Sequence, residues 1–222
     1  MNWELDHVFL ATPDLARVER ALSHIGLKFN RHVVHQGQGT ANACCVFQNA
    51  FFEVLGIHNV DELKSELVHP LALYERIQWA ATGACPLGLC YRALDGNLDV
   101  AGLPFESWYY KPTYIPSGAG IPIVTPRRAL TEPLIFLSAD PNRRTNLQEA
   151  AARYGENRTL TGVTLRRPSA AAPLSDGVRW FENQGLLSIE DGTSYSIELE
   201  WDHGREGSCR RFNDDIPLVL RW

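Results

Sequence analysis

The segments LDHVFL (residues 5–10) and FFEVL (residues 51–55) decide how this chain folds. Each is typical of a buried β-strand in which an ionisable side chain stands among large apolar ones. Because strand side chains alternate between two faces, we expect Leu5, His7 and Phe9 to share one face of the first strand.

Glu53 lies in the second segment between apolar neighbours. Burying a lone carboxylate costs several kcal/mol, so a glutamate in such a strand needs a partner. His7 is the first candidate for that partner. We therefore expect one pocket that contains both side chains, with or without a metal ion between them.

Composition limits the classes of function. The chain has 222 residues, 45% hydrophobic content and a net charge of −5, and no stripe of Lys and Arg that would indicate a nucleic-acid partner. No apolar run reaches the roughly 18 residues of a membrane helix. The first residues lack the basic region and apolar run of a signal peptide. These observations predict a cytoplasmic protein with neither a membrane nor a nucleic-acid partner.

Five cysteines occur at no zinc-ribbon spacing. Cys44 and Cys45 are neighbours in one predicted strand, so their side chains should point to opposite faces. Buried, reduced thiols are the simplest expectation for such cysteines in a cytoplasmic protein.

Residues 4–57 predict the order β-α-β-β-β. Thr12 is a candidate N-cap, Pro13 suits the first helical position, and Gly26 is the natural end of the helix. The remaining expectations for this module are strands at 27–35, 40–48 and 51–57 and a glycine turn at 36–39.

Residues 58–138 predict a second, looser copy of this order. A short helix at 60–67 and a helix from His69 to Gly83 precede its strands. The other expected elements are strands at 85–93, 104–112 and 134–137, a short turn or helix at 95–102, and a loop at 113–132.

The rest of the chain predicts a third, degenerate copy. Its expected elements are a strand at 160–165, a helix at 173–183, a hairpin of 186–190 with 195–201 across Asp191-Gly192, and a strand at 217–220. We therefore predict paired modules at 1–138, a polar connector with a helical turn at 139–157, and a third βαβββ-like module at 158–222 packed on the same domain. The fold class is α+β: repeated βαβββ modules form curved mixed sheets around a cleft, with helices on the outer faces.

The first module resembles a known family. LDHV at residues 5–8, followed by TPDL at 12–15, is similar to the opening of vicinal oxygen chelate (VOC) proteins. HQGQGTANA at 35–43, followed by FEVL at 52–55, resembles the glyoxalase-like branch of that superfamily. The resemblance implies paired βαβββ modules that curl into a cleft. Many members hold a divalent metal there, with ligands from the first and last strand of each module.

Carried over to this chain, the resemblance implies His7 and Glu53 as ligands of one divalent ion (Zn, Mn, Ni or Fe). The second module has Leu89 and residues 135–136 near the corresponding positions, and none of these can bind a hard metal. Two ligands plus water bind a metal weakly.

The third module offers Gly162 and Glu198 at the corresponding positions. Glu198 would be a third ligand, but strand alternation places it on a polar face with Ser196 and Glu200. The alternatives to a metal site therefore stay open. One is a metal-free polar pocket in which Glu53 accepts hydrogen bonds from His7, Thr40 or the Gly39–Thr40 backbone, and the other is purely structural pairing.

Several polar residues are candidates for substrate binding. His35 lies at the glycine turn, where its ring should reach the cleft mouth. Thr40 and Asn42 share a strand face, and asparagine is unfavourable in strands, which indicates a hydrogen-bonding role in ligand contact or in fixing register. Gly39 provides turn geometry. Trp108 would line an apolar wall of the cleft or pack in the core.

The leading functional interpretation is a glyoxalase-like enzyme that acts on a small molecule by lyase or isomerase chemistry. The resemblance implies that a metal polarises adjacent substrate oxygens, and that Glu53 or a metal-bound water transfers the proton of an enolate-like intermediate. The alternatives are a non-catalytic small-molecule binding module and a structural subunit with a vestigial cleft. The sequence leaves open whether the cleft forms within one chain or across a homodimer.

Overall fold

The first module has the element order predicted for it. The computed structural model describes residues 3–115, 119–138, 140–212 and 215–222. Its first elements are β1 (Trp3–Ala11), α1 (Leu15–Ser23), β2 (Phe29–His35), β3 (Thr40–Val46) and β4 (Phe51–Ile57).

The second module follows through a series of short helices. They are α2 (Val60–Leu63), the 3₁₀ helix η1 (His69–Leu71), α3 (Leu73–Ile77) and α4 (Trp79–Thr82). The strands are β5 (Leu87–Ala93), β6 (Trp108–Tyr110), β7 (Ile121–Ile123) and β8 (Leu134–Leu137).

The remaining elements begin with a helix, α5 (Arg143–Tyr154), and then form a second sheet. They are β9 (Leu160–Pro168), α6 (Asp176–Asn183), β10 (Ser188–Gly192), β11 (Ser196–Trp201), the 3₁₀ helix η3 (Asp202–Gly204), β12 (Cys209–Arg211) and β13 (Leu218–Arg221).

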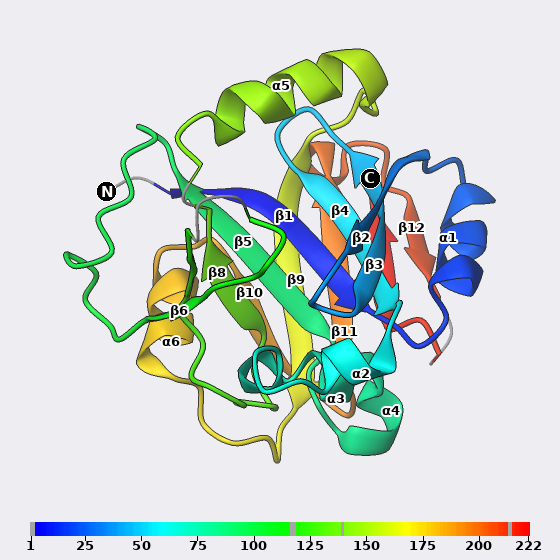
Figure 1. Ribbon diagram of the computed structural model, residues 1–222. Coiled ribbons are helices and arrows are strands. Elements are labelled where there is room, and N and C mark those ends of the chain that lie inside the picture. Colours follow the sequence, from blue (N-terminus) through cyan, green and yellow to red (C-terminus); the bar gives the residue numbers. More distant parts are fainter. Residues whose placement is uncertain (1–2, 116–118, 139, 213–214) are drawn as a thin grey trace.

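The strands of both modules join in one mixed sheet, in the order β2-β3-β4-β1-β5-β8-β7-β6 (Figure 1). Its two halves are equivalent: β1 runs parallel to β4, β5 runs parallel to β8, and β1 and β5 pair antiparallel at the centre. The predicted α+β class is thus confirmed. Both modules belong to a single chain, so the cleft between them needs no second copy.

The helix α1 covers the outer side of β3 and β4 by burying Val18 and Leu22. Its N-cap is Asp14 and not the predicted Thr12, because the Asp14 carboxylate accepts the backbone N–H of Arg17. The Thr12 hydroxyl accepts from the backbone N–H of Asp14 and closes the preceding turn.

The second module departs from the prediction in its short strands. Residues 95–102 form turns, one of the two predicted possibilities, but the predicted strand at 104–112 shortens to β6. The predicted loop at 113–132 contains β7, which pairs with β6 and β8, and residues 116–118 of that loop lie outside the described residues. The extent of these short strands depends on the strands with which they pair, and those partners are distant in sequence.

The predicted hairpin of residues 186–190 with 195–201 is wrong. The second sheet has the order β10-β9-β11-β13-β12, so β9 lies between the two strands. β10 runs parallel to β9, and β11 runs antiparallel to it. β10 and β11 therefore each pair with the long strand β9, and they do not pair with each other.

The connector also differs from its prediction. In place of one helical turn, α5 is a full helix of 12 residues. Leu147 and Ala151, four residues apart, pack together against Cys44, Val46 and Phe51. Figure 1 shows α5 lying across the end of the sheet near β4.

The main core lies between the two sheets. Val8, Leu10 and Leu89 of the first sheet share one cluster with Leu165 and Leu199 of the second. The opposite face of the first sheet therefore remains for a cavity. Within the described ranges, no helix has the length and apolar character required to cross a membrane.

The cysteines follow the prediction with one exception. Cys44 and Cys45 are buried on opposite faces of β3, with Cys45 in the core between the sheets. Cys85 and Cys90 are also buried and free, but Cys209 is exposed.

Candidate functional site

A β-bulge in β1 positions the first residues of the site. The register between β1 and β5 shifts between Leu5 and His7, so Asp6 has no partner across the strands. Bulges are common beside active sites because they redirect side chains. Leu5 therefore packs against the core between the sheets, while His7 and Phe9 line the cavity on the other face. The expectation that Leu5 shares a face with His7 is wrong for this reason.

His7 and Glu53 lie together, as the sequence predicts. The parallel register places Phe51 opposite His7 and Glu53 opposite Phe9. His7 Nε2 is 3.7 Å from Glu53 Oε2, and its ring stacks on Phe51 with centroids 4.2 Å apart. This separation brings the two groups close without a direct hydrogen bond.

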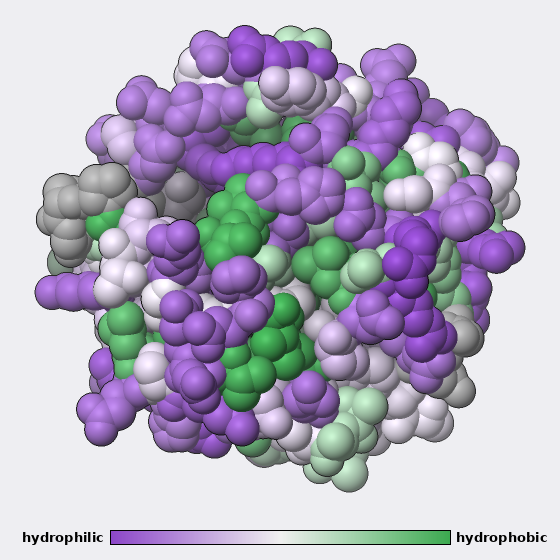
Figure 2. All heavy atoms as spheres, turned by 45° about the vertical axis from the view of Figure 1, so that its right-hand side comes forward, coloured by the Kyte–Doolittle hydropathy of each residue, from purple (hydrophilic) through white to green (hydrophobic). Residues whose placement is uncertain are grey.

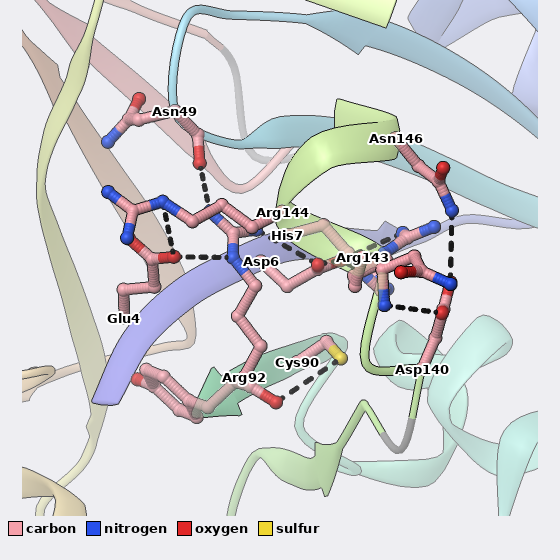
Figure 3. Close-up of polar contacts among 12 residues, drawn as sticks. Glu4, Asp6, His7, Asn49, Cys90, Arg92, Asp140, Arg143, Arg144 and Asn146 are labelled. Carbon is pink, nitrogen blue, oxygen red and sulfur yellow. Dashed lines mark hydrogen bonds and ion pairs between the residues drawn. The ribbon is translucent and has the colours of Figure 1, made fainter. Parts of the chain in front are cut away.

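Asp6 is the centre of a buried charge cluster that the sequence did not reveal (Figure 3). Its carboxylate accepts from His7 Nδ1 at 2.6 Å, from Arg92 Nη1 at 2.9 Å and from Arg143 Nε at 2.8 Å. Burial alone would raise the pKa of Asp6, but His7 and Arg143 hold that pKa well below its usual range. The only local signal was an aspartate within an apolar strand, since both arginines are distant in sequence.

Asn42 holds Glu53 in place. Its Nδ2 donates to Glu53 Oε1 at 2.9 Å, and its Oδ1 accepts the backbone N–H of Val33 at 3.0 Å. Asn42 therefore has the predicted hydrogen-bonding role and fixes the β2–β3 pairing at the same time. The expected bond from Thr40 to Glu53 is absent, because the Thr40 hydroxyl is instead 2.9 Å from His35 Nδ1.

The glycine turn at residues 36–39 lies at the edge of the cavity, which only Gln38 of the turn lines. Gly39 has a φ of +79°, and a Cβ there would lie 2.3 Å from the backbone oxygen of Asn59. Neither Gly39 nor Thr40 lines the cavity, whereas His35 and Gln38 do. Burial lowers the pKa of His35, which favours its neutral form.

A cavity of about 450 Å³, a size suited to a small-molecule ligand, is lined by His7, His35, Asn42 and Glu53 among others. One wall, from β2, β3 and β4, carries most of its polar side chains. The opposite wall, from α3 and the second module, is mostly apolar. On the face shown in Figure 2, hydrophobic side chains gather near the middle and hydrophilic ones surround them.

Two predicted residues lie elsewhere. Trp108 does not line the cavity: its indole N–H donates to the Thr125 carbonyl oxygen at 2.9 Å, and Tyr110 lies in the wall instead. Glu198 lies on β11 in the second sheet, where it pairs with Arg166 and Arg221. Glu198 does not line the cavity, so it does not join His7 and Glu53 as a third ligand.

The donor groups do not fit a resident metal ion. Among the described residues, only Asp6, His7 and Cys90 form a group of three possible ligands within 4.8 Å of one another. Two arginine side chains already bind the Asp6 carboxylate, and burial raises the pKa of the Cys90 thiol well above its usual range. His7 and Glu53 are thus left as two donors, fewer than a stable catalytic metal site requires.

The fold and cavity define a class: a single-chain pair of βαβββ-related modules with a small-molecule cavity on the shared sheet. The family model for the glyoxalase-like domain matches residues 5–131. This chain belongs to the glyoxalase-like domain family, within the VOC superfamily that the first module resembles.

One solved structure shows the same fold at low identity, and a second match covers part of this chain with a low TM-score. A hypothetical protein from Staphylococcus aureus is 11% identical with a TM-score of 0.65, and the match covers 100% of this chain and 98% of that one. A methylmalonyl-CoA epimerase from Streptomyces coelicolor, in complex with 2-nitronate-propionyl-CoA, is 19% identical with a TM-score of 0.41 over 61% of this chain and 97% of that one. No curated protein matches the sequence significantly.

Proposed function

We propose that this chain is an enzyme that moves a proton on a carbon atom beside the carbonyl group of a small molecule, as isomerases and many lyases do. Its family and the size of its cavity support a small-molecule substrate. The polar side chains of Glu53 and His7, which line the cavity, support the proton-transfer chemistry.

The hydrogen bonding and the burial of the Glu53 carboxylate are the observations that carry this proposal. Asn42 occupies Oε1, while Oε2 accepts no hydrogen bond from the described residues and faces His7 across 3.7 Å. Glu53 is only 6% exposed. A buried, fixed carboxylate with one oxygen free of hydrogen bonds is suited to act as a general base.

His7 supplies the complementary acid. Because Asp6 stays ionised, the proton of the imidazole lies on Nδ1, within 2.6 Å of the Asp6 carboxylate. Nε2 then faces Glu53 and the cavity. In the imidazolium form, Nε2–H donates a hydrogen bond to the substrate oxygen, and the ionised Asp6 stabilises the positive charge.

The proposed step balances without a co-reactant. Glu53 Oε2 takes a proton from the carbon beside the carbonyl group. The electron pair of that C–H bond forms a carbon–carbon double bond, and the carbonyl π pair moves to the oxygen, which His7 stabilises. Return of the proton to the same or another carbon completes an isomerisation, and loss of a leaving group completes an elimination.

Exchange of substrate hydrogens in D₂O tests this proposal directly. We expect NMR to show enzyme-dependent exchange beside the carbonyl group in a panel of 2-oxo acids, ketones and aldehydes. Glu53→Gln should lower the exchange rate by about 100-fold or more, since it keeps the shape and the Asn42 contact but removes the base.

Glu149→Gln is the matched control, because Glu149 is exposed on α5 outside the cavity, and it should leave exchange unchanged. Equal exchange in wild type and Glu53→Gln would contradict the proposal, as would no exchange for any compound. Ligand-induced thermal stabilisation without exchange would favour the alternative, a non-catalytic binding module.

A further inference from the structure

Arg31 is a cation of the cavity that the proposed chemistry does not use. It lines the cavity from the edge strand β2 and is exposed at the rim. The other cavity-lining arginine, Arg143, is neutralised by Asp6. No carboxylate in the described part of the chain lies within 4 Å of the Arg31 guanidinium. Arg31 is therefore available to a ligand.

The strand register places Arg31 in line with Glu53. Arg31 pairs with Cys44 across β2 and β3, and Cys44 pairs with Glu53 across β3 and β4. Neighbouring strands are about 4.8 Å apart, so the two Cα atoms are separated by roughly 10 Å. Cys44 stands between them and also lines the cavity, and burial keeps its thiol neutral by raising its pKa.

The same row continues into the apolar half of the sheet. Glu53 pairs with Phe9, Phe9 with Gly88, and Gly88 with Leu134. The neighbouring side chains on this wall are also apolar: Leu73, Ile121, Ile123 and Phe136. A ligand lying across the strands thus meets a cation, then the Glu53–His7 pair, then a hydrocarbon surface.

We infer that the substrate is an amphipathic 2-oxo acid, whose carboxylate pairs with Arg31 and whose hydrocarbon chain lies against the wall around Leu134. Its carbonyl group and the neighbouring C–H group then lie at Glu53 and His7. This last placement rests on the proposed function, whereas the sites for the carboxylate and the chain rest on Arg31 and the apolar wall.

Calorimetric titration with three probes tests the inference. 2-Oxooctanoate carries both features, octan-2-one lacks the carboxylate, and pyruvate lacks the chain. We expect 2-oxooctanoate to bind wild type and Arg31→Gln to weaken that binding by about ten-fold or more, the value of one lost charged hydrogen bond. Octan-2-one should bind wild type and Arg31→Gln equally, and pyruvate should bind wild type at least about 100-fold more weakly than 2-oxooctanoate.

Arg20→Gln is the matched control, because it removes the same charge from an exposed position on α1 outside the cavity. The inference is overturned if Arg31→Gln and Arg20→Gln bind 2-oxooctanoate equally, if pyruvate binds as tightly, or if 2-oxooctanoate does not bind. Circular dichroism checks that each variant is folded.

Glu53→Gln separates this inference from the proposed function. It should still bind 2-oxooctanoate. Binding that depends on Arg31, with no hydrogen exchange in wild type, overturns the proton transfer alone. Hydrogen exchange that depends on Glu53, with no effect of Arg31→Gln on the binding of 2-oxooctanoate, overturns only the role of Arg31 as the site for the substrate carboxylate.

Discussion

Asp6 connects the proposed acid His7 to the connector helix α5. Its buried carboxylate lies between His7 and the guanidinium groups of Arg92 and Arg143. Removing one member of such a cluster leaves the others buried and uncompensated, which typically costs 3–5 kcal/mol.

We therefore expect Asp6→Asn to lower the free energy of unfolding at pH 7 by about 3 kcal/mol. The pKa of Asp6 is held below the ordinary aspartate value of 3.8, so its stabilising contribution is complete well above that pH and is lost as the pH falls below it. The stability difference between wild type and Asp6→Asn should shrink from pH 6 to pH 3. Urea unfolding at both values measures this.

Asp191→Asn provides the control, since Asp191 is exposed in the second sheet. Its effect on stability should stay within about 0.5 kcal/mol. A difference between wild type and Asp6→Asn that is constant with pH would contradict the ionised state of Asp6.

At the scale of the element, close packing of β1 on β5 sets the position of Phe9, which stands opposite Glu53 in the register. A Cβ on Gly88 would lie 1.9 Å from the Phe9 ring, so only glycine leaves space for it. Gly88→Ala should destabilise the protein by about 1 to 3 kcal/mol through overpacking.

A second variant tests that cause. Combining Gly88→Ala with Phe9→Leu frees the space that the ring occupied, so the pair should destabilise less than the sum of the single changes in thermal unfolding. Additive effects would show that the Phe9 contact is not the reason for the glycine.

At the scale of the whole molecule, the two sheets share a core. Val8, Leu10 and Leu89 pack against residues of the second sheet, and each such side chain stabilises the fold by about 1.5 to 3 kcal/mol when buried. We propose that residues 158–222 belong to the same folding unit as residues 1–138.

Truncation tests this proposal. A fragment of residues 1–138 should bind a hydrophobic dye strongly and lack a cooperative unfolding transition, because one face of its sheet is uncovered. Full-length protein should unfold in one transition that is the same by fluorescence and circular dichroism. A fragment with native near-UV circular dichroism would show that the first sheet folds independently.

The predicted homodimer and cytoplasmic localisation stay predictions.

The sequence by itself determined the elements of the first module and the pairing of His7 with Glu53. Both follow from local information: hydrophobic periodicity assigns strand faces, and β4 and β8 have the predicted bounds within a residue. The module order then brings the first and last strands together. The resemblance of the glycine turn and its flanking strand led to the family.

Only the tertiary structure decided the rest of the site. The bulge at Asp6 depends on register with β5, and the partners of Asp6 come from residues 92 and 143. The row from Arg31 to Leu134 crosses six strands, and β9 separates the two strands of the predicted hairpin. These features depend on which distant segments pair. Pairing is set by the packing free energy of the whole chain, and the periodicity of one strand carries no information about its partner.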